Sequence, residues 1–193
     1  MFARTNRLLL RPGWMEDAPA LAQAIGEESI VRNLARAPWP YAEDDARTFL
    51  GMQRDMRLPD FLIFSRTRGA PRLVGGCGIG LPAEDGQPEL GYWIARRYWG
   101  LGFATEAARA VVEIARATGI QNLTAGHFID NPASGNVLRK IGFRATGHIA
   151  PRFCCARQKT APYALYEMSD EVDMPRSDLA IELYGEESQP LAA

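Results

Sequence analysis

The segment 104–115 constrains the fold most, because its apolar residues recur at the spacing of one helix face. They lie at i, i+3, i+4, i+7, i+8 and i+11 and are Ala104, Ala107, Ala108, Val111, Val112 and Ala115. Charged side chains of alternating sign fall off this stripe at Glu106, Arg109, Glu113 and Arg116. The pattern predicts an amphipathic helix that packs one face on a core. Gly119 is a residue type that commonly ends such a helix.

Two glycines stand directly before this helix, at Gly100 and Gly102, and the strand-like run 87–95 precedes them. Amides at a helix N-terminus have no partner in their own helix and lie at the positive end of its dipole. Because glycine has no Cβ, an anion can approach these amides closely. The segment therefore predicts a cradle for a phosphate or pyrophosphate. The alternative is a glycine turn that only reverses the chain. Neither an NTP-binding G-x-x-x-x-G-K-[ST] loop nor a dinucleotide G-x-G-x-x-G pattern is present, since Thr105 stands at the third glycine.

The rest of the chain alternates strand-like and helix-like patterns. Strands are expected within 7–12, 61–67, 72–80, 87–95, 121–129, 144–150 and 163–169. Further helices are expected within 15–28, within 42–56 with Ala46, Phe49, Leu50 and Met56 buried, and within 131–141. Asn131 is the expected N-cap of the last helix, with Pro132 at its first position. This order predicts an α/β (α+β) architecture with a mixed sheet.

Length and charge narrow the classes of function. The chain has 193 residues, 47% of them hydrophobic, and a formal net charge of −1. We expect one domain over residues 1–169, and an acidic tail over 170–193 that is partly disordered or lightly helical. A near-neutral charge argues against nucleic acid and against an anionic membrane as partners.

The same features suggest a cytoplasmic protein. The start of the chain shows no signal-peptide pattern, and no apolar run approaches the roughly 20 residues that span a bilayer. Three cysteines, two of them adjacent, are best interpreted as reduced thiols. Cys77 lies in an apolar run, as expected of a small buried side chain.

Two longer stretches carry a resemblance to a known family. "ELGYWIARRYWGLGFATEAARAVVEIA" at 89–115 and "DNPASGNVLRKIGF" at 130–143 resemble the GNAT superfamily of acetyl-CoA-dependent N-acetyltransferases. Together with "TNRLLLRP" and "VRNLARAPWPYAEDDARTFL", they are most similar to its ribosomal-protein N-terminal acetyltransferase (RimJ/RimL-type) branch. The resemblance covers about residues 4–169. It implies a splayed mixed sheet of about six to seven strands flanked by about four helices.

The resemblance also implies where acetyl-CoA binds. The family's pyrophosphate loop, Gln/Arg-x-x-Gly-x-Gly/Ala, is matched by Trp99, Gly102 and Ala104, and, two residues earlier, by Arg97, Gly100 and Gly102. Contacts to the pyrophosphate are expected from the amides of Trp99, Gly100, Leu101, Gly102, Phe103, Ala104 and Thr105. The strand edge of Trp93, Ile94, Ala95 and Arg96 is expected to pair with the pantetheine arm. Because Trp99 replaces the usual polar residue, binding of the pyrophosphate should depend on main-chain amides and on Arg96 or Arg97.

Acetyl transfer to an amine needs a base for the ammonium and an acid for the leaving thiolate. Strand alternation places Glu89 on one face with Gly91 and Trp93, and related enzymes often carry a glutamate here, so Glu89 is the expected base. Its alternative is a solvent-facing strand residue. The tyrosine that many members use as the acid is replaced by Leu138, so Ser134 is the preferred substitute and Tyr92 a weaker one. Asn131 is expected to touch the cofactor arm or a water, and both it and Ser134 alternatively only cap their helix.

The acceptor site is the least defined part of the sequence. Trp39 and Tyr41 lie in the loop where related folds receive the acceptor, and His127 is a further candidate; packing on the core is the alternative for all three. No His, Cys and carboxylate spacing suggests a metal site. The chain is thus expected to be an N-acetyltransferase for a protein N-terminus or small amine, as a monomer or homodimer. The rival interpretation is a catalytically silent CoA-binding sensor or scaffold.

Overall fold

A computed structural model describes residues 1–66, 69–81 and 86–168 of the chain. The expected acidic tail at 170–193 lies outside these residues. Within them, eight strands form one sheet in the order β1-β2-β3-β4-β5-β6-β8-β7. The strands are β1 Ala3–Arg4, β2 Leu8–Arg11, β3 Asp60–Ser65, β4 Arg72–Gly80, β5 Glu89–Ile94, β6 Thr124–Phe128, β7 Phe143–Cys154 and β8 Lys159–Met168.

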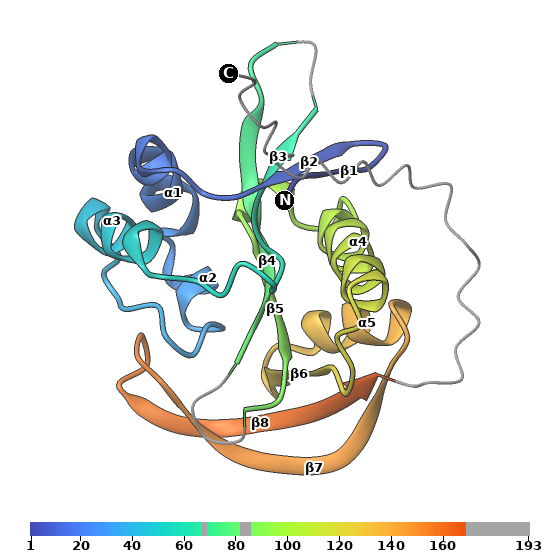
Figure 1. Cartoon of the computed structure of the whole chain (residues 1–193). Helices are drawn as coiled ribbons and strands as arrows, with labels where there is room; N and C mark the ends of the chain where they lie inside the picture. The colour runs from blue at the N-terminus through green and yellow to red at the C-terminus, as the bar shows by residue number, and fades with distance from the viewer. Residues whose placement is uncertain (67–68, 82–85, 169–193) are drawn as a thin grey trace.

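Every neighbouring pair in this sheet is antiparallel except β5 and β6, which run parallel. A parallel pair needs a crossover connection, and here the crossover is a helix. The sheet is therefore mixed and divides naturally at β5 and β6. Figure 1 shows the two halves, with the long β7–β8 hairpin crossing below the rest of the molecule.

Helices cover both faces of the sheet (Figure 1). They are α1 Ala18–Ile25, α2 Glu28–Val31, α3 Glu43–Gly51, α4 Phe103–Ala117 and α5 Pro132–Lys140, with 3-10 turns η1 at Met15–Asp17 and η2 at Arg96–Tyr98. The first three lie on one side, and α4 and α5 lie on the other. An apolar core lies on each face, one between the sheet and α4, the other between the sheet and α1 to α3.

The apolar stripe predicted for residues 104–115 is confirmed in the crossover helix α4. Five of its six predicted residues are buried and Ala104 is half-buried, while Ala110 and Ile114 widen the buried face. The small alanines let this helix lie close to β4 and β5, the two strands nearest the predicted cradle. Among the described residues no helix is both long and apolar enough for a membrane span.

The mixed sheet and the helix positions are confirmed, with small differences in count. The eighth strand is β1 and the additional helix is α2, and both are too short to leave a periodic pattern. The burial predicted for Met56 is wrong, because α3 ends at Gly51 and Met56 is 92% exposed in the following turn. Cys77 is buried as predicted.

Candidate functional site

Strands β5 and β6 separate shortly after they meet. They pair only at Glu89 with Thr124 and at Leu90 with Ala125. Beyond this point β5 stays paired to β4 as far as Ile94, and β6 stays paired to β8 as far as Phe128. The facing edges of β5 and β6 thus diverge into a slot in the middle of the sheet. Such an opening leaves main-chain donors and acceptors for a ligand to use.

The hydrogen bonds of β5 show which residues face this slot. The Pro88 carbonyl accepts from Thr124 of β6, whereas the Ala95 amide donates to Val74 of β4. Because alternate residues point their backbone groups to opposite edges, Tyr92 and Ile94 present theirs to the slot. Of the predicted edge at 93–96, Trp93 and Ala95 therefore pair with β4, and Arg96 belongs to η2. Of the four predicted residues, Ile94 faces the slot, and contact of this edge with the pantetheine arm stays a prediction.

The glycine turn at the end of β5 has the geometry of an anion cradle. Gly100 and Gly102 have φ angles of 77° and 79°, in the left-handed region that favours glycine. Gly102 is the N-cap of α4, whose first recorded backbone bond is from Glu106 to Gly102. In the part of the chain that the structure describes, no backbone bond is recorded from the amides of Gly100 to Thr105. These amides can therefore bind a pyrophosphate without a lysine.

Arg7 braces this cradle and was not singled out from the sequence. Its guanidinium pairs with Glu106 at 2.6 Å and donates to the Leu101 carbonyl at 2.9 Å. Thr5 donates to the same carboxylate at 2.6 Å. Since Glu106 lies in the first turn of α4, where bound phosphate would repel it, Arg7 offsets that charge. No local sequence pattern links Arg7 to Glu106, because the two residues are 99 positions apart.

The tryptophan of the turn has a polar contact of its own. The Trp99 indole Nε1 donates to the Ile94 carbonyl at 2.7 Å, which is one of the slot-facing groups. Arg96 lies over the Trp99 ring and within 3.9 Å of Glu27, and Arg97 lies over Tyr98. Both arginines are exposed beside the cradle. They remain the candidate cations for phosphate.

The opposite wall of the slot is α5, which brings two candidate acids together. The Tyr92 hydroxyl lies 2.9 Å from both the Ser134 Oγ and the Ser134 carbonyl. Burial raises the pKa of Tyr92, so its hydroxyl stays protonated at neutral pH. Leu138 is fully buried. Asn131 occupies the N-cap position as predicted, but its side chain makes no capping bond and is available to a ligand.

Glu89 lies at the closed end of the slot in a polar cluster. Its carboxylate accepts two bonds from Arg152 of β7, at 2.5 and 3.0 Å, and one from the Tyr163 hydroxyl of β8, at 2.9 Å. Burial, together with the Glu89 charge, raises the pKa of Tyr163, which therefore acts as a donor. The Glu89 side chain keeps 18% of its surface exposed. The expected alternation is confirmed, because Trp93 packs on the α1–α3 side while Leu90, Tyr92 and Ile94 pack on the α4 side.

The acceptor-loop candidates lie on the same side of the sheet as Glu89. Trp39 is 41% exposed, and Tyr41 is half-buried against the α1–α3 core. Burial, with Asp45 nearby, raises the pKa of Tyr41 to about 12. His127 is buried, with Nδ1 2.8 Å from the Phe128 carbonyl and Nε2 3.4 Å from the Tyr166 hydroxyl. Its surroundings are those of a core histidine and favour the packing alternative.

The β7–β8 hairpin holds this loop in place. At its tip, Arg157 makes two bonds to Asp130, at 2.8 and 2.9 Å, and one to the Arg32 carbonyl at 2.6 Å. The Cys155 amide donates to the Ala35 carbonyl at 2.9 Å. The hydrogen bonds from Arg157 hold the pKa of Asp130 below its usual range, as expected for a permanent ion pair. The loop that follows α2 is thus anchored rather than free.

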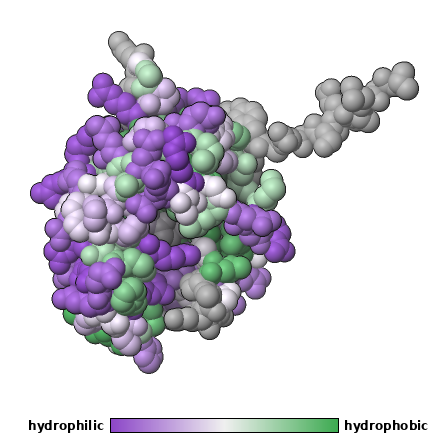
Figure 2. All heavy atoms as spheres, turned by 90° about the vertical axis from the view of Figure 1, so that its left-hand side faces the viewer, coloured by the Kyte–Doolittle hydropathy of each residue, from purple (hydrophilic) through white to green (hydrophobic). Residues whose placement is uncertain are grey.

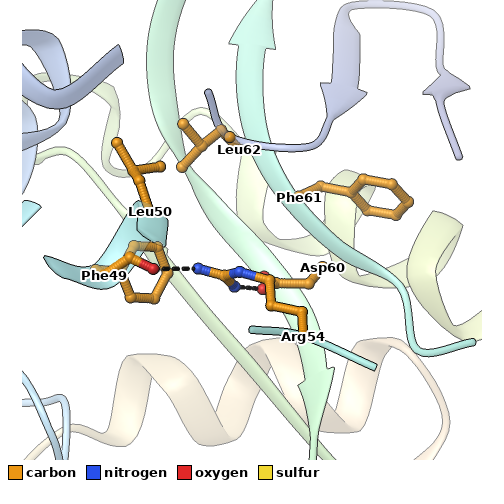
Figure 3. Close-up of a pocket in the computed structure, with 7 residues that line it drawn as sticks. Phe49, Leu50, Arg54, Asp60, Phe61 and Leu62 are labelled. Carbon is orange, nitrogen blue, oxygen red and sulfur yellow. Dashed lines mark hydrogen bonds and ion pairs between the residues drawn. The ribbon is translucent and has the colours of Figure 1, made fainter. Parts of the chain in front are cut away.

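A small cavity on this side is structural rather than a ligand site. It measures about 10 Å³ and is lined by Gly13, Phe49, Leu50, Arg54, Asp60, Phe61 and Leu62. Figure 3 shows Arg54 reaching the Phe49 carbonyl, at 2.7 Å, and the Asp60 carboxylate. This volume holds about one water and no larger molecule. The contact ties the end of α3 to β3.

Figure 2 views the molecule from the side of α1 to α3, where hydrophilic side chains dominate. Across the described ranges, no group of three or more His, Cys, Asp or Glu residues is arranged to hold a metal ion. The arrangement that remains is a slot between two strands, an amide cradle at one end and a carboxylate at the other. A ligand in it would be long and narrow, with an anionic end.

Comparisons with known proteins agree with this geometry. A family model described as an acetyltransferase (GNAT) domain matches residues 7–144. The uncharacterized N-acetyltransferase p20 of Bacillus licheniformis is 27% identical over 149 residues, which cover 74% of this chain and 82% of that protein. A GNAT-family acetyltransferase structure from Bacillus anthracis superposes with a TM-score of 0.73 at 22% identity, over 89% of this chain and all of that one. A RimL ribosomal L7/L12 alpha-N-protein acetyltransferase structure, solved with coenzyme A, gives 0.69 at 18% identity, over 86% and 97%.

Proposed function

The chain belongs to the GNAT acetyltransferase family, and from this premise we propose that it moves the acetyl group of acetyl-CoA to a primary amine by direct attack in a ternary complex. The observation that carries the proposal is the slot between β5 and β6, which joins the cradle at Gly100–Thr105 to Glu89. A pantetheine arm would lie against Tyr92 and Ile94. Asn131 would meet it from α5.

The two proton transfers of the reaction take place on opposite faces of β5. On the α1–α3 side, Glu89 accepts the ammonium proton, directly or through a water, so that the amine nitrogen can form its bond to the acetyl carbon. On the α4–α5 side, the carbon–sulfur bond breaks and the thiolate takes a proton from the hydroxyl pair of Ser134 and Tyr92. The slot-facing amides of Tyr92 and Ile94 are donors available to the developing oxyanion.

Two of the three cysteines, Cys77 and Cys154, support direct attack rather than an acetyl-enzyme. Burial raises the pKa of the Cys77 thiol, which keeps it protonated and unreactive. Cys154 is fully buried and its Sγ lies 3.3 Å from the Leu34 carbonyl. Neither thiol can serve as an acyl carrier, because a nucleophilic cysteine must be an accessible thiolate.

One observation favours the rival function of a CoA-binding sensor. Both carboxylate oxygens of Glu89 are engaged by Arg152, so Glu89 must exchange one contact for the amine or a water before it acts as a base. The two functions differ in turnover. If coenzyme A binds at micromolar concentration while no amine in a broad panel is acetylated, the protein is a sensor or scaffold.

The first test is stabilisation by the co-substrate. Acetyl-CoA at 100 times its dissociation constant should add about 2.7 kcal/mol to the free energy of unfolding. A thermal melt with acetyl-CoA measures this stabilisation. ATP and NAD at equal concentration are the controls, and neither should stabilise the protein or compete with acetyl-CoA for its site. Turnover is then followed with small amines, polyamines and peptides of varied N-terminal residue, since the ribosomal branch points to protein N-termini. Absence of any stabilisation by coenzyme A would contradict the proposal at its base.

The hydroxyl pair gives a second prediction. Ser134→Ala and Tyr92→Phe should each lower kcat by about tenfold and leave the KM for acetyl-CoA within twofold, because either hydroxyl can still protonate the thiolate. The double variant should lose more than the two single losses combined. Steady-state kinetics measure this, with Thr48→Ala, which removes an exposed hydroxyl of α3 that donates to the Asp44 carbonyl, as the control. An unchanged kcat in the double variant would remove both groups from the mechanism.

A further inference from the structure

We propose that the acceptor is an amine that carries an acidic group on the same molecule, and that Arg36 selects it. This inference rests on the proposed function and names the substrate class of the same site. It begins with Gly91, which is exposed although β5 lies between β4 and β6. A Cβ at Gly91 would meet no atom within 4 Å. The sheet is therefore open at this residue, between Glu89 and Trp93 on the same face.

Arg36 lies at the edge of this opening. Its Nη2 is 3.5 Å from the position that a Cβ of Gly80 would occupy. Gly80 is directly opposite Glu89 in the β4–β5 ladder, so the two residues point to the same face. With Cβ atoms of opposed residues about 4.5–5.5 Å apart, the Arg36 guanidinium lies within about 9 Å of the Glu89 Cβ. A short molecule can span the two groups.

Among the residues that the structure describes on this face, two other arginines are already paired. Arg152 is paired with Glu89, and Arg54 is paired with Asp60, which lies beside Gly78 in the neighbouring part of β4. For Arg36, by contrast, no ion pair or hydrogen bond is recorded within the described ranges of the chain, and its side chain is exposed. An exposed guanidinium next to an open site attracts anions.

The backbone on the N-terminal side of Arg36 is anchored to the hairpin tip. The preceding carbonyl, of Ala35, accepts the amide of Cys155 at the hairpin tip, and the Arg32 carbonyl accepts from Arg157. This anchoring keeps the loop that carries Arg36 on the acceptor side of the sheet. The ammonium of the acceptor would then lie near Glu89 while its carboxylate or phosphate pairs with Arg36, an arrangement of two charge-assisted contacts that a simple alkylamine cannot make.

The test compares matched acceptors that differ only in the acidic group. β-Alanine is compared with β-alaninamide, phosphoethanolamine with ethanolamine, and an Asp-initiated tripeptide with its Asn-initiated form. In the unsubstituted protein we expect the acidic member of at least one pair to have a kcat/KM at least tenfold higher. Arg36→Gln should remove this ratio, and Arg36→Lys should restore part of it. Arg47→Gln, at an exposed arginine of α3, is the control and should leave the ratio unchanged. Comparing ratios between variants cancels differences in amine basicity.

The outcomes separate this proposal from the proposed function. If amines are acetylated but the neutral members are equal or better substrates, the function stands and the role of Arg36 is wrong. If the ratio of kcat/KM between the acidic and neutral members is unchanged in Arg36→Gln, the role of Arg36 is also wrong. If no amine is acetylated, the proposed function fails, and calorimetric titration of the same pairs into the protein–CoA complex still decides this proposal: tighter binding of the acidic member, lost in Arg36→Gln, supports it, and equal binding overturns it.

Discussion

Glu89→Gln is expected to lower kcat by about 10²–10⁴-fold at pH 7, while the dissociation constant of acetyl-CoA stays within twofold. The amide cannot take the ammonium proton, yet it keeps the shape of the carboxylate, and Glu89 is far along the strand from the cradle at Gly102. Stopped-flow or steady-state kinetics give kcat, and titration calorimetry gives the binding constant. At high pH, where more of the amine is already unprotonated, the loss should become small.

Two controls make this result interpretable. Glu43→Gln removes an exposed carboxylate of α3 that pairs with Arg47, and kcat should not change. Tyr163→Phe removes one donor to Glu89 without removing the carboxylate, so its effect on kcat should be much smaller than that of Glu89→Gln. If Glu89→Gln retains full activity at neutral pH, the cluster with Arg152 is structural and the base lies elsewhere.

Gly102→Val is expected to weaken acetyl-CoA binding at least about thirtyfold, about 2 kcal/mol, because a β-branched residue is strained at a φ of 79° and its side chain would cover the free amides. Titration calorimetry on the folded variant measures the effect. The cradle depends on backbone conformation, so the loss should appear in the KM for acetyl-CoA and much less in the KM for the amine.

Gly119→Val is the matched control for this substitution. Gly119 follows the other end of α4, has a φ of 77°, and a Cβ there would meet no atom within 4 Å. Its replacement introduces the same strain into the same part of the fold without touching the cradle. Comparable losses of acetyl-CoA affinity in both variants would show that the effect of Gly102→Val comes from general destabilisation of α4.

The parts of the fold that could be predicted are those with a local signal. The stripe on α4 and the glycines before it gave the strand, turn and helix in their correct order, because periodicity and a positive φ are properties of neighbouring residues. The two-residue strand β1 is defined only by pairing with β2, so no local pattern could reveal it. Which residues of β5 face the slot could not be predicted, since only the hydrogen bonds of Pro88 and Ala95 show this alternation.

The residues of the candidate site likewise fall into those with a local sequence signal and those without one. Glu89, Ser134 and the cradle residues were expected from motifs, and their roles remain predictions. Arg7, Arg36 and Arg152 were not singled out, because each lies far along the chain from the group it faces: Arg152 meets Glu89 only through the return of the β7–β8 hairpin. Sequence separation hides such contacts, and a single sequence offers no pattern that would bring them together.

The divergence of β5 and β6 has a consequence for how such proteins can change. Along this opening, the groups available for acetyl-CoA belong mainly to the main chain, whereas the groups around Gly91 that meet the acceptor are side chains from loops and the last two strands. Substitutions can therefore exchange one acceptor for another, while the donor site tolerates changes of side chain as long as Gly100 and Gly102 are kept. A new acceptor preference would require altered residues only on the α1–α3 side of the sheet.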